Sequence, residues 1–411
     1  MWKKLFSSVL VFGVAVGIID GTGAVGDAQA QEIEAVSGSN TTFTDIDGHW
    51  AASDIQQAVM KGYVEGYDNG TFKPERSVKR SEFIKMIVSA MALDVEDVTK
   101  GNDWYKAYAA AAKEAGIYQD EFGSEQQWNE AITRTEMAKF AVKAAGKDEG
   151  QYYYIDFNDP GYMYLATDAG LIHGKGGGKV APEGLTTRAQ SITVIERLLK
   201  LQDGEVLPKA DKLTRSNAEF NWRRTNINTM LDDYLADSYH PYDESFMVES
   251  RDGLYKGELI RMTVIDLEDE NDPNRNLVDI NGLQWGARPQ YKPEKYNYYP
   301  LKNLKESFLV VFTTKVHYVK DTKKYGSGDY VSMNNYYGKY SSDDRDELNR
   351  GVLNGIPFLF SMEGEIQSQM VLLPKKVMES HNSVLRFGLK SSAVTVGITD
   401  IEVFKGVIEH E

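Results

Sequence analysis

Apolar positions in the first half of the chain follow helical spacing in three separate segments. Met137, Phe140 and Ala141 lie at i, i+3 and i+4 and predict the buried face of a helix. The segment 133–136, Thr-Arg-Thr-Glu, supplies a capping hydroxyl and an acid in the first turn. The matching positions in the other two segments are Phe83, Met86 and Ile87, and Ser191, Val194 and Ile195.

These segments recur with a constant period. The residues spaced by 54 are Arg80, Arg134 and Arg188, then Gly62, Gly116 and Gly170, then Ala58, Ala112 and Ala166, and also Trp50 and Trp104. Each unit predicts a short helix, a glycine stop, a turn rich in Gly, Asp or Asn, and a second helix. Pro74 and Pro182 predict extended backbone before the second helix, where copy two has Trp128. Because such small units bury little alone, we expect all three to share a core.

The repeated residues resemble the S-layer homology domain. The stretch 43–51, Phe-Thr-Asp-Ile-Asp-Gly-His-Trp-Ala, is similar to the opening of that domain, and 62–74 is similar to its central turn. The stretches 78–83, 132–137 and 186–190 resemble its Thr-Arg-Ala-Glu helix start. The resemblance covers about residues 41–203. It departs at Thr99, which stands in place of Asp45, and at Asn158 and Gln190, which stand in place of Trp and Glu.

This resemblance implies a pseudo-three-fold unit whose grooves bind secondary cell-wall polysaccharide, typically through a pyruvylated terminal sugar. It implies that Arg80, Arg134 and Arg188 are main binding residues. The chemistry is consistent, because a guanidinium pairs with a carboxylate through two hydrogen bonds and a helix N-terminus adds free N–H groups. The other candidate carbohydrate-binding residues are Trp50, Trp104, Asp45, Gly66, Glu82 and Glu136.

Each candidate also has a structural alternative. In this alternative the tryptophans pack against the first helix, and the glycines allow the backbone conformation of the turns. Glu82 and Glu136 cap their helices. The arginines form salt bridges to a carboxylate of the next repeat. The sequence leaves both interpretations open.

The rest of the chain predicts further segments. Lys3, Lys4, the apolar stretch 5–19 and the Ala-Gln-Ala at 28–30 are typical of a signal peptide over 1–30, with an uncleaved membrane anchor as the alternative. No later stretch is apolar over about 18 residues, so we expect no transmembrane span after cleavage. The predicted domains are repeats at 41–96, 97–150 and 151–203, a linker at 204–216, and a helix plus β domain at 217–411.

The second half changes from helical to strand patterning. Residues 217–237 predict a helix. The β-branched and aromatic stretches 258–267, 307–319, 357–373 and 383–404 predict strands. The expected fold class is therefore multidomain α + β: an α-helical three-repeat unit followed by a mainly β, sandwich or jelly-roll-like domain.

Composition excludes several functions. A formal net charge of -15 and a pI near 5.0 argue against nucleic acid as a partner. The absence of cysteine excludes disulfides, thiol nucleophiles and Cys-ligated metals. No His-Glu-x-x-His or Gly-x-Ser-x-Gly motif occurs, so we predict no catalytic residue, metal or cofactor. The acidic run 266–272 lacks the EF-hand spacing for calcium and is typical of a solvated loop. The tyrosines at 291, 296, 298 and 299 and at 336, 337 and 340 either stack on sugars or pack in the β domain.

We therefore expect a secreted protein of the cell wall and cell surface. In this hypothesis the repeats hold it non-covalently to the wall polysaccharide, and the β domain is displayed for binding or structure. The alternatives are a wall-attached hydrolase whose β domain is catalytic and a subunit of an S-layer lattice.

Overall fold

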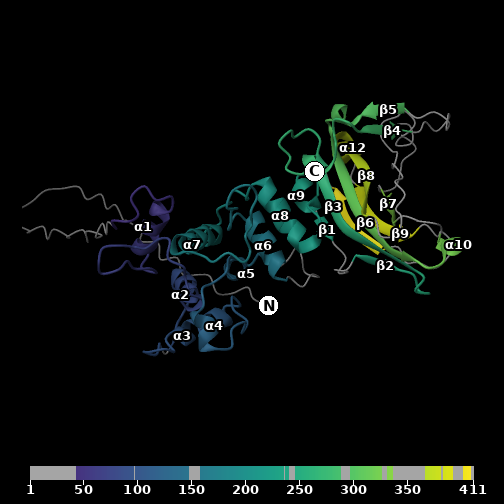
Figure 1. Cartoon of the computed structure of the whole chain (residues 1–411). Coiled ribbons are helices and arrows are strands. Elements are labelled where there is room, and N and C mark those ends of the chain that lie inside the picture. The colour runs from purple at the N-terminus through teal and green to yellow at the C-terminus, as the bar shows by residue number, and fades with distance from the viewer. Residues whose placement is uncertain are drawn as a thin grey trace, which may run out of the picture. The chain divides into compact units, whose positions relative to one another are not determined.

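The computed structural model of this chain combines helices and strands (Figure 1). It describes residues 43–96, 98–147, 158–235, 237–239, 246–287, 297–325, 331–336, 366–380, 383–391 and 401–408. The predicted signal peptide at 1–30 and the tyrosines at 291, 296, 337 and 340 lie outside these ranges. Among the described residues, no helix has the length and apolar character needed to cross a bilayer.

Each repeat contains a short first helix and a second helix that begins at the repeated arginine. The helices are α1 (Ala52–Met60) and α2 (Arg80–Ala90) in the first repeat, α3 (Tyr105–Glu114), α4 (Glu125–Asn129) and α5 (Arg134–Ala144) in the second, and α6 (Asp159–Asp168) and α7 (Arg188–Gln202) in the third. The second repeat differs, because Trp128 lies in α4 and not in extended backbone. The Ser124 hydroxyl accepts the N–H of Gln127 at 3.3 Å and so starts this extra helix.

A closed ring of backbone hydrogen bonds joins the three repeats. The N–H of Val78 donates to the carbonyl of Thr186 at 3.0 Å, and the N–H of Thr186 donates to the carbonyl of Ile132 at 3.0 Å. The N–H of Ile132 then donates to the carbonyl of Val78 at 2.8 Å. These residues are 54 apart, so every repeat gives one hydrogen bond to one neighbour and accepts one from the other. The ring gives the unit its pseudo-three-fold symmetry.

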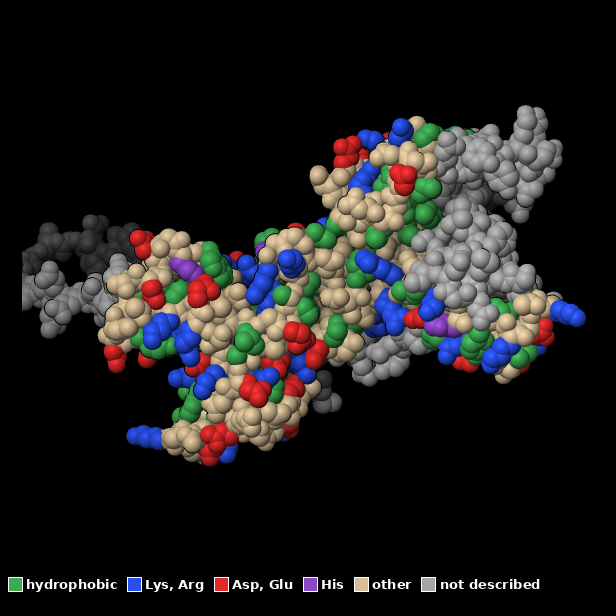
Figure 2. Space-filling model, viewed as in Figure 1, with side chains coloured by type: hydrophobic (Ala, Val, Ile, Leu, Met, Phe, Trp, Pro, Cys, Tyr) green, Lys and Arg blue, Asp and Glu red, His purple; other side chains and the backbone are tan. Residues whose placement is uncertain are grey.

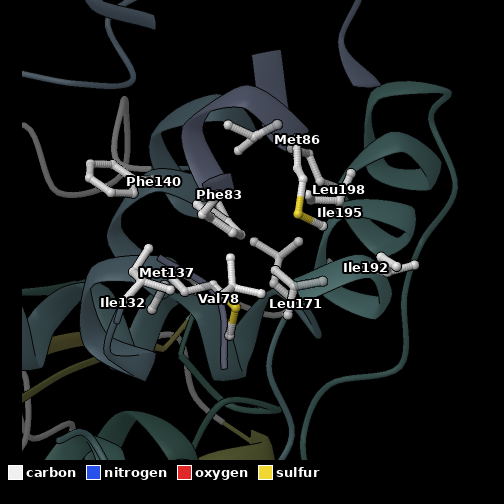
Figure 3. Close-up of a cluster of buried hydrophobic side chains, with 14 of the residues drawn as sticks. Val78, Phe83, Met86, Ile132, Met137, Phe140, Leu171, Ile192, Ile195 and Leu198 are labelled. Carbon is white, nitrogen blue, oxygen red and sulfur yellow. The ribbon is translucent and has the colours of Figure 1, made fainter. Parts of the chain in front are cut away.

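The repeats share one hydrophobic core, as their spacing predicts. Figure 3 shows side chains of all three repeats in this cluster, among them Val78, Ile132 and Leu171. The Phe83 ring of α2 and the Phe140 ring of α5 stack with centroids 6.3 Å apart. The predicted stripes at i, i+3 and i+4 are buried in all three second helices. Burying them together stabilises units that would be too small alone.

The expected linker at 204–216 is partly helical. Helix α8 (Lys212–Arg223) begins inside it, because the Asp211 carboxylate accepts the N–H of Thr214 at 2.9 Å and caps the first turn. Helix α8 packs on α6 and ends at Arg224, whose φ is 56°. A short α9 (Ile227–Met230) follows. The single helix expected over 217–237 is therefore two shorter helices.

The described strands form antiparallel sheets. One sheet has the order β2 (Met247–Glu249), β3 (Tyr255–Asp266), β6 (Ser307–Val319) and β8 (Ile366–Pro374), and another has the order β1 (Asp237–Tyr239), β10 (Ile401–Ile408), β9 (Ser383–Ser391) and β7 (Val331–Tyr336). Strands β4 (Gln284–Ala287) and β5 (Asn297–Pro300) pair separately. The short helices are η1 (Arg275–Leu277), η2 (Leu301–Asn303), α10 (Thr322–Tyr325) and α12 (Lys375–Ser380). The mixed helix and strand architecture is confirmed, and the sandwich arrangement stays a prediction.

Candidate functional site

The repeated arginines are the first residues of α2, α5 and α7, and each side chain extends toward the turn of the next repeat around the ring. Arg188 donates from Nη2 to the carbonyl of Glu65 at 2.8 Å. Arg134 donates from Nη2 to the carbonyl of His173 at 2.9 Å. Residues 65 and 173 are two 54-residue periods apart, so these two contacts are equivalent. The repeat symmetry thus places the same cation in two inter-repeat positions.

Arg188 lies in a cavity of about 540 Å³, here called groove A. It is lined by Gly62, Tyr63, Val64, Glu65, Gly66, Tyr67, Arg76, Val78, Glu82, Lys85, Met86, Ser89, Trp104, Tyr108 and Arg188. These residues come from all three repeats. Groove A therefore brings together four of the residues that the sequence predicts: Arg188, Gly66, Glu82 and Trp104.

The guanidinium of Arg188 is only partly satisfied within groove A. Its central carbon lies 4.3 Å from the ring centroid of Phe72, and its Nε is buried with no hydrogen-bond partner among the described residues. Burial lowers the pKa of Arg188. No carboxylate of the described chain forms an ion pair with it. An anion that entered the groove would therefore meet a poorly hydrated cation with an unused N–H.

The equivalent cavity around Arg134, here called groove B, measures about 190 Å³. It is lined by Trp50, Arg134, Met137, Ile172, His173, Gly174, Lys175, Gln190, Thr193, Val194 and Arg197. Arg134 is 4% exposed and also donates from Nε to the carbonyl of Val180 at 3.0 Å. Burial lowers the pKa of Arg134, and no described carboxylate pairs with it. Groove B thus shares with groove A an arginine that pairs with no described carboxylate, and Trp50 is part of its lining.

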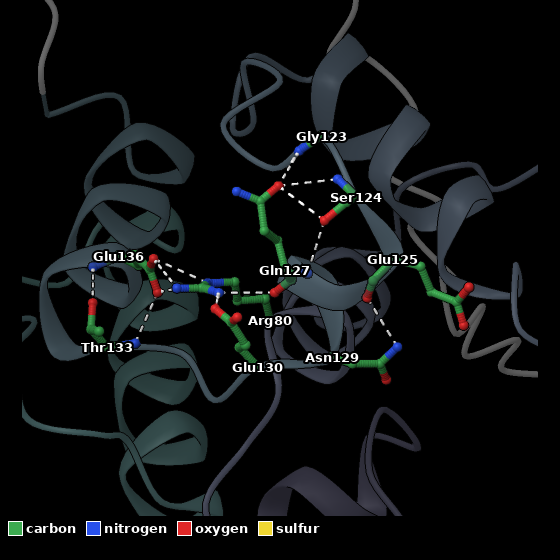
Figure 4. Close-up of polar contacts among 9 residues, drawn as sticks. All are labelled: Arg80, Gly123, Ser124, Glu125, Gln127, Asn129, Glu130, Thr133 and Glu136. Carbon is green, nitrogen blue, oxygen red and sulfur yellow. Dashed lines mark hydrogen bonds and ion pairs between the residues drawn. The ribbon is translucent and has the colours of Figure 1, made fainter.

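The third arginine has a different environment (Figure 4). Arg80 pairs with Glu136 at 2.8 Å and with Glu130 at 2.6 Å, and it donates to the carbonyl of Gln127 at 2.9 Å. Burial opposes the charge of Arg80, but these carboxylates outweigh it and raise its pKa. Asn158 occupies the tryptophan position here, and its side chain caps α6. The salt-bridge interpretation therefore describes Arg80 and neither of its counterparts.

The two predicted tryptophans differ in exposure. Trp50 is 62% exposed, whereas Trp104 is partly buried against Tyr105 and Tyr108. The Lys85 ammonium lies 5.9 Å from the Trp104 ring centroid. Trp104 thus both packs on the core and lines groove A, while Trp50 is open to solvent.

The remaining candidates have contacts within the repeats. The Asp45 carboxylate accepts the N–H groups of Phe72 and Lys73, each at 2.7 Å. Burial alone would raise the pKa of Asp45, but these hydrogen bonds lower it below its ordinary value. Gly66 lies so close to Phe43 that a Cβ would overlap its ring. These contacts support structural roles for both residues.

The two predicted glutamates act as helix caps. Glu82 accepts the N–H of Lys79 at 3.0 Å, and Glu136 accepts the N–H of Thr133 at 2.9 Å. Glu82 also pairs with Arg76 at 2.7 Å. Glu82 lines groove A but pairs with Arg76, and Glu136 pairs with Arg80. Neither carboxylate forms an ion pair with Arg134 or Arg188.

Sequence reasoning missed several groove residues. Lys85 and Arg197 line the grooves but lie outside the family-like motifs, and Lys175 lies in the turn of the third repeat. The signal was present in the period, because Lys175 and Arg197 stand two periods after Tyr67 and Ser89 of groove A. Comparing the side chains at each period position would have found them.

The acidic run 266–272 forms ion pairs and hydrogen bonds with other residues of the chain. Lys375 pairs with Asp266 at 2.9 Å and with Glu268 at 2.6 Å. Arg275 donates to the carbonyls of Asp266 and Leu267. In the part of the chain that the structure describes, no group of three His, Asp or Glu side chains is arranged to hold a metal. Asp266 and Glu268 therefore have a cationic partner within the described chain.

Comparison with known proteins agrees with the repeat geometry. The model of the S-layer homology domain matches residues 42–84 and 158–190. The exoglucanase XynX of Acetivibrio thermocellus is 31% identical over 180 residues, which cover 39% of this chain and 16% of the exoglucanase. The surface-layer 125 kDa protein of Lysinibacillus sphaericus is 30% identical over 187 residues, which cover 42% of this chain and 16% of that protein.

A shorter match extends the same pattern. The cellulosome-anchoring protein of Acetivibrio thermocellus is 43% identical over 56 residues, 14% of this chain and 12% of the relative. The chain therefore spans less than a fifth of the length of these relatives. On the combined ground of repeats, domain match and relatives, this chain carries S-layer homology domains and is a protein of the cell surface.

Proposed function

We propose that the three repeats hold this protein non-covalently to the cell wall by binding an anionic secondary polysaccharide, with a pyruvylated sugar as the expected ligand. Arg188 in groove A and Arg134 in groove B are the binding cations in this proposal. Trp104 and Trp50 supply aromatic surface for the sugar ring. The domain beyond residue 217 is displayed outward for binding or structure.

One observation carries the proposal. Arg134 is buried and Arg188 is half-buried, neither pairs with a carboxylate of the described chain, and each lines a cavity. Retaining unpaired guanidinium groups at such positions costs free energy unless a ligand anion completes their hydrogen bonds. A ketal-linked pyruvate offers a carboxylate that a guanidinium binds through two hydrogen bonds.

Surface charge is compatible with this assignment. Lys and Arg side chains and Asp and Glu side chains both occur over the N-terminal helices on the face shown in Figure 2. An overall acidic chain binds an anion when the local field is positive, since surface charges beyond about 8 Å are screened at physiological salt. The groove residues therefore matter more than the net charge of -15.

A hydrolase remains the alternative for the second half. The exoglucanase and an amylopullulanase of Thermoanaerobacterium thermosulfurigenes are relatives with enzymatic names, but this chain covers 16% and 10% of them. Their activity does not extend to this chain on such coverage. The lattice-subunit alternative is tested by self-assembly of the purified chain.

A sedimentation experiment tests the anchoring proposal. The full mature chain is mixed with cell walls that carry their secondary polymer and with walls stripped of it by acid. The proposal predicts that the protein sediments with intact walls alone and that soluble purified polymer competes. Equal sedimentation with stripped walls would contradict a role for the polysaccharide.

A further inference from the structure

Grooves A and B are equivalent in backbone but differ in charge. Glu65 and Glu82 of groove A are replaced in groove B by His173 and Gln190, at positions two periods later. Groove A thus sets the cations Arg76, Lys85 and Arg188 against two carboxylates, whereas no carboxylate lines groove B.

Groove B also gains cations of its own. Lys175 stands where groove A has Tyr67, and Arg197 stands where it has Ser89. With Arg134, three cationic side chains line a cavity of about 190 Å³, smaller than the roughly 540 Å³ of groove A. A cavity of this size holds a compact anionic group, and all three cations would then lie close to it.

Arg134, Arg197 and His173 of groove B have side-chain nitrogen atoms for which no hydrogen-bond partner is described. Arg134 directs its Nε and Nη2 to the carbonyls of Val180 and His173, and a guanidinium has five N–H donors. Arg197 donates from Nη1 to the carbonyl of Leu171 at 3.2 Å. The Nε2 atom of His173 is buried with no hydrogen-bond partner among the described residues.

Two carboxylates lie near groove B without lining it, and each accepts a hydrogen bond from a neutral group of the protein. Asp54 faces Arg197 from α1, but its Oδ2 accepts the Thr193 hydroxyl at 2.6 Å. Burial lowers the pKa of Arg197 despite Asp54. Asp211 faces His173, and its carboxylate caps α8 through Thr214.

From this asymmetry we infer that groove B binds a compact anionic group with two negative charges, such as a phosphate dianion, whereas groove A binds a single carboxylate. The inference rests on the proposed function and assigns different anions to the two grooves. A second ligand charge gains a further attraction from Lys175 and Arg197 in groove B, whereas in groove A it meets the repulsion of Glu65 and Glu82. The two grooves would then recognise two groups of one wall polymer.

The tryptophans provide one reporter for each groove. The full mature chain is labelled with 5-fluorotryptophan, and the ¹⁹F resonances of Trp50 and Trp104 are assigned with Trp50→Phe and Trp104→Phe. Inorganic phosphate and pyruvate are titrated at about pH 8 and constant ionic strength. We predict that phosphate half-saturates the Trp50 shift at an about tenfold lower concentration than pyruvate does, and that Trp104 shows no such preference.

Matched variants exchange the charges of the two grooves. Lys175→Tyr with Arg197→Ser gives groove B the groove A residues and is expected to abolish the preference at Trp50, while the Trp104 response reports intact folding. Glu65→His with Glu82→Gln is expected to create the preference at Trp104, and Gln190 already serves as the cap at that position of α7. Equal half-saturation of Trp50 by both anions would overturn the inference yet leave the proposed anchoring standing. Silence of both reporters, with no retention by walls, would remove the proposed function as well.

Discussion

Arg80 and Glu136 form a bidentate ion pair between the first and second repeats. Nη2 of Arg80 lies 2.8 Å from one carboxylate oxygen of Glu136, and Nε lies 3.1 Å from the other. Glu136 accepts the N–H of Thr133 at the same time. Among the three repeated arginines, Arg80 is therefore the one whose charge is already satisfied by carboxylates of the protein.

Replacing Arg80 tests this division of roles. Arg80→Ala should lower the free energy of unfolding by about 2 kcal/mol, because it strands Glu136 and Glu130 beside a partly buried site. Urea denaturation followed by circular dichroism measures the loss. A double-mutant cycle with Glu136→Gln should give a coupling between the two sites. Additive effects would mean that the pair contributes nothing.

Gly66 is required by the close approach of Phe43. A Cβ at position 66 would overlap the Phe43 ring, so Gly66→Ala should destabilise the fold by about 1–3 kcal/mol. Replacing the ring by a smaller side chain, in the double variant Gly66→Ala with Phe43→Leu, should recover part of that loss. Gly123→Ala is the matched control, since its Cβ would meet only the Gln127 side chain at 3.8 Å. Denaturation midpoints compare the variants, and no recovery in the double variant would exclude this contact as the cause.

Glu219 predicts a pH dependence of stability. It is fully buried in α8, where its oxygens accept the N–H groups of Asn228 at 2.9 Å and Thr229 at 2.8 Å. Burial is the largest influence and raises the pKa of Glu219 from 4.5 to about 8, although the hydrogen bonds lower it.

The raised pKa of Glu219 determines the direction in which stability changes with pH. Between pH 4.5 and about 8 the unfolded chain ionises at Glu219 while the folded chain keeps its proton, so this group makes stability fall as the pH rises. The loss reaches at most about 5 kcal/mol and is complete above about pH 8. Glu219→Gln should remove this part of the slope when unfolding is measured at pH 5 and pH 8. An unchanged slope in the variant would assign it to other groups.

Asn226 joins the α8–α9 turn to β3 through a buried amide. Its Nδ2 donates to the carbonyl of Val264 at 2.9 Å, and its Oδ1 accepts the N–H of Val264 at 2.7 Å. Asn226→Ala leaves both groups of Val264 unpaired and should cost about 3 kcal/mol. Exposed Asn129→Ala, which loses solvent-exposed hydrogen bonds to the Glu125 carbonyl and from Lys79, should change stability by less than about 0.5 kcal/mol. Comparable losses in both variants would contradict a special role for Asn226.

The repeat fold could be predicted because its signals are local and occur three times. The stripe at Phe83 and its equivalents, the glycine stops and the cap at Thr133 each act within a few residues, and the period aligns them. The start of helix α8 was predicted at residue 217 instead of Lys212, because its first turn is mostly polar and its start depends on the cap at Asp211. Helix α4 was missed for a similar reason, since Ser124 caps it without an apolar period behind it.

The sequence indicated which residue types would line the candidate site, but not which arginines would be paired or how exposed each tryptophan would be. Three arginines at one spacing gave no sign that Arg80 would meet Glu130, because that contact depends on the turn that precedes α5 and not on the motif. The exposure of Trp50 and the partial burial of Trp104 likewise depend on neighbours such as Tyr108. The pairing of Arg80 and the exposure of the tryptophans depend on distances between repeats, which the spacing of residues within one repeat does not predict.

Wall retention of the arginine variants tests the central claim most directly. Arg134→Ala with Arg188→Ala, in residues 31–411 without the predicted signal peptide, removes the groove cations, and Arg80→Ala removes the counterpart that the protein's own carboxylates bind. Our account predicts that the double variant no longer sediments with walls that carry their polymer, although it remains folded by circular dichroism, and that folded Arg80→Ala sediments like the unmodified chain. Retention of the double variant, or loss of binding in folded Arg80→Ala alone, would contradict it.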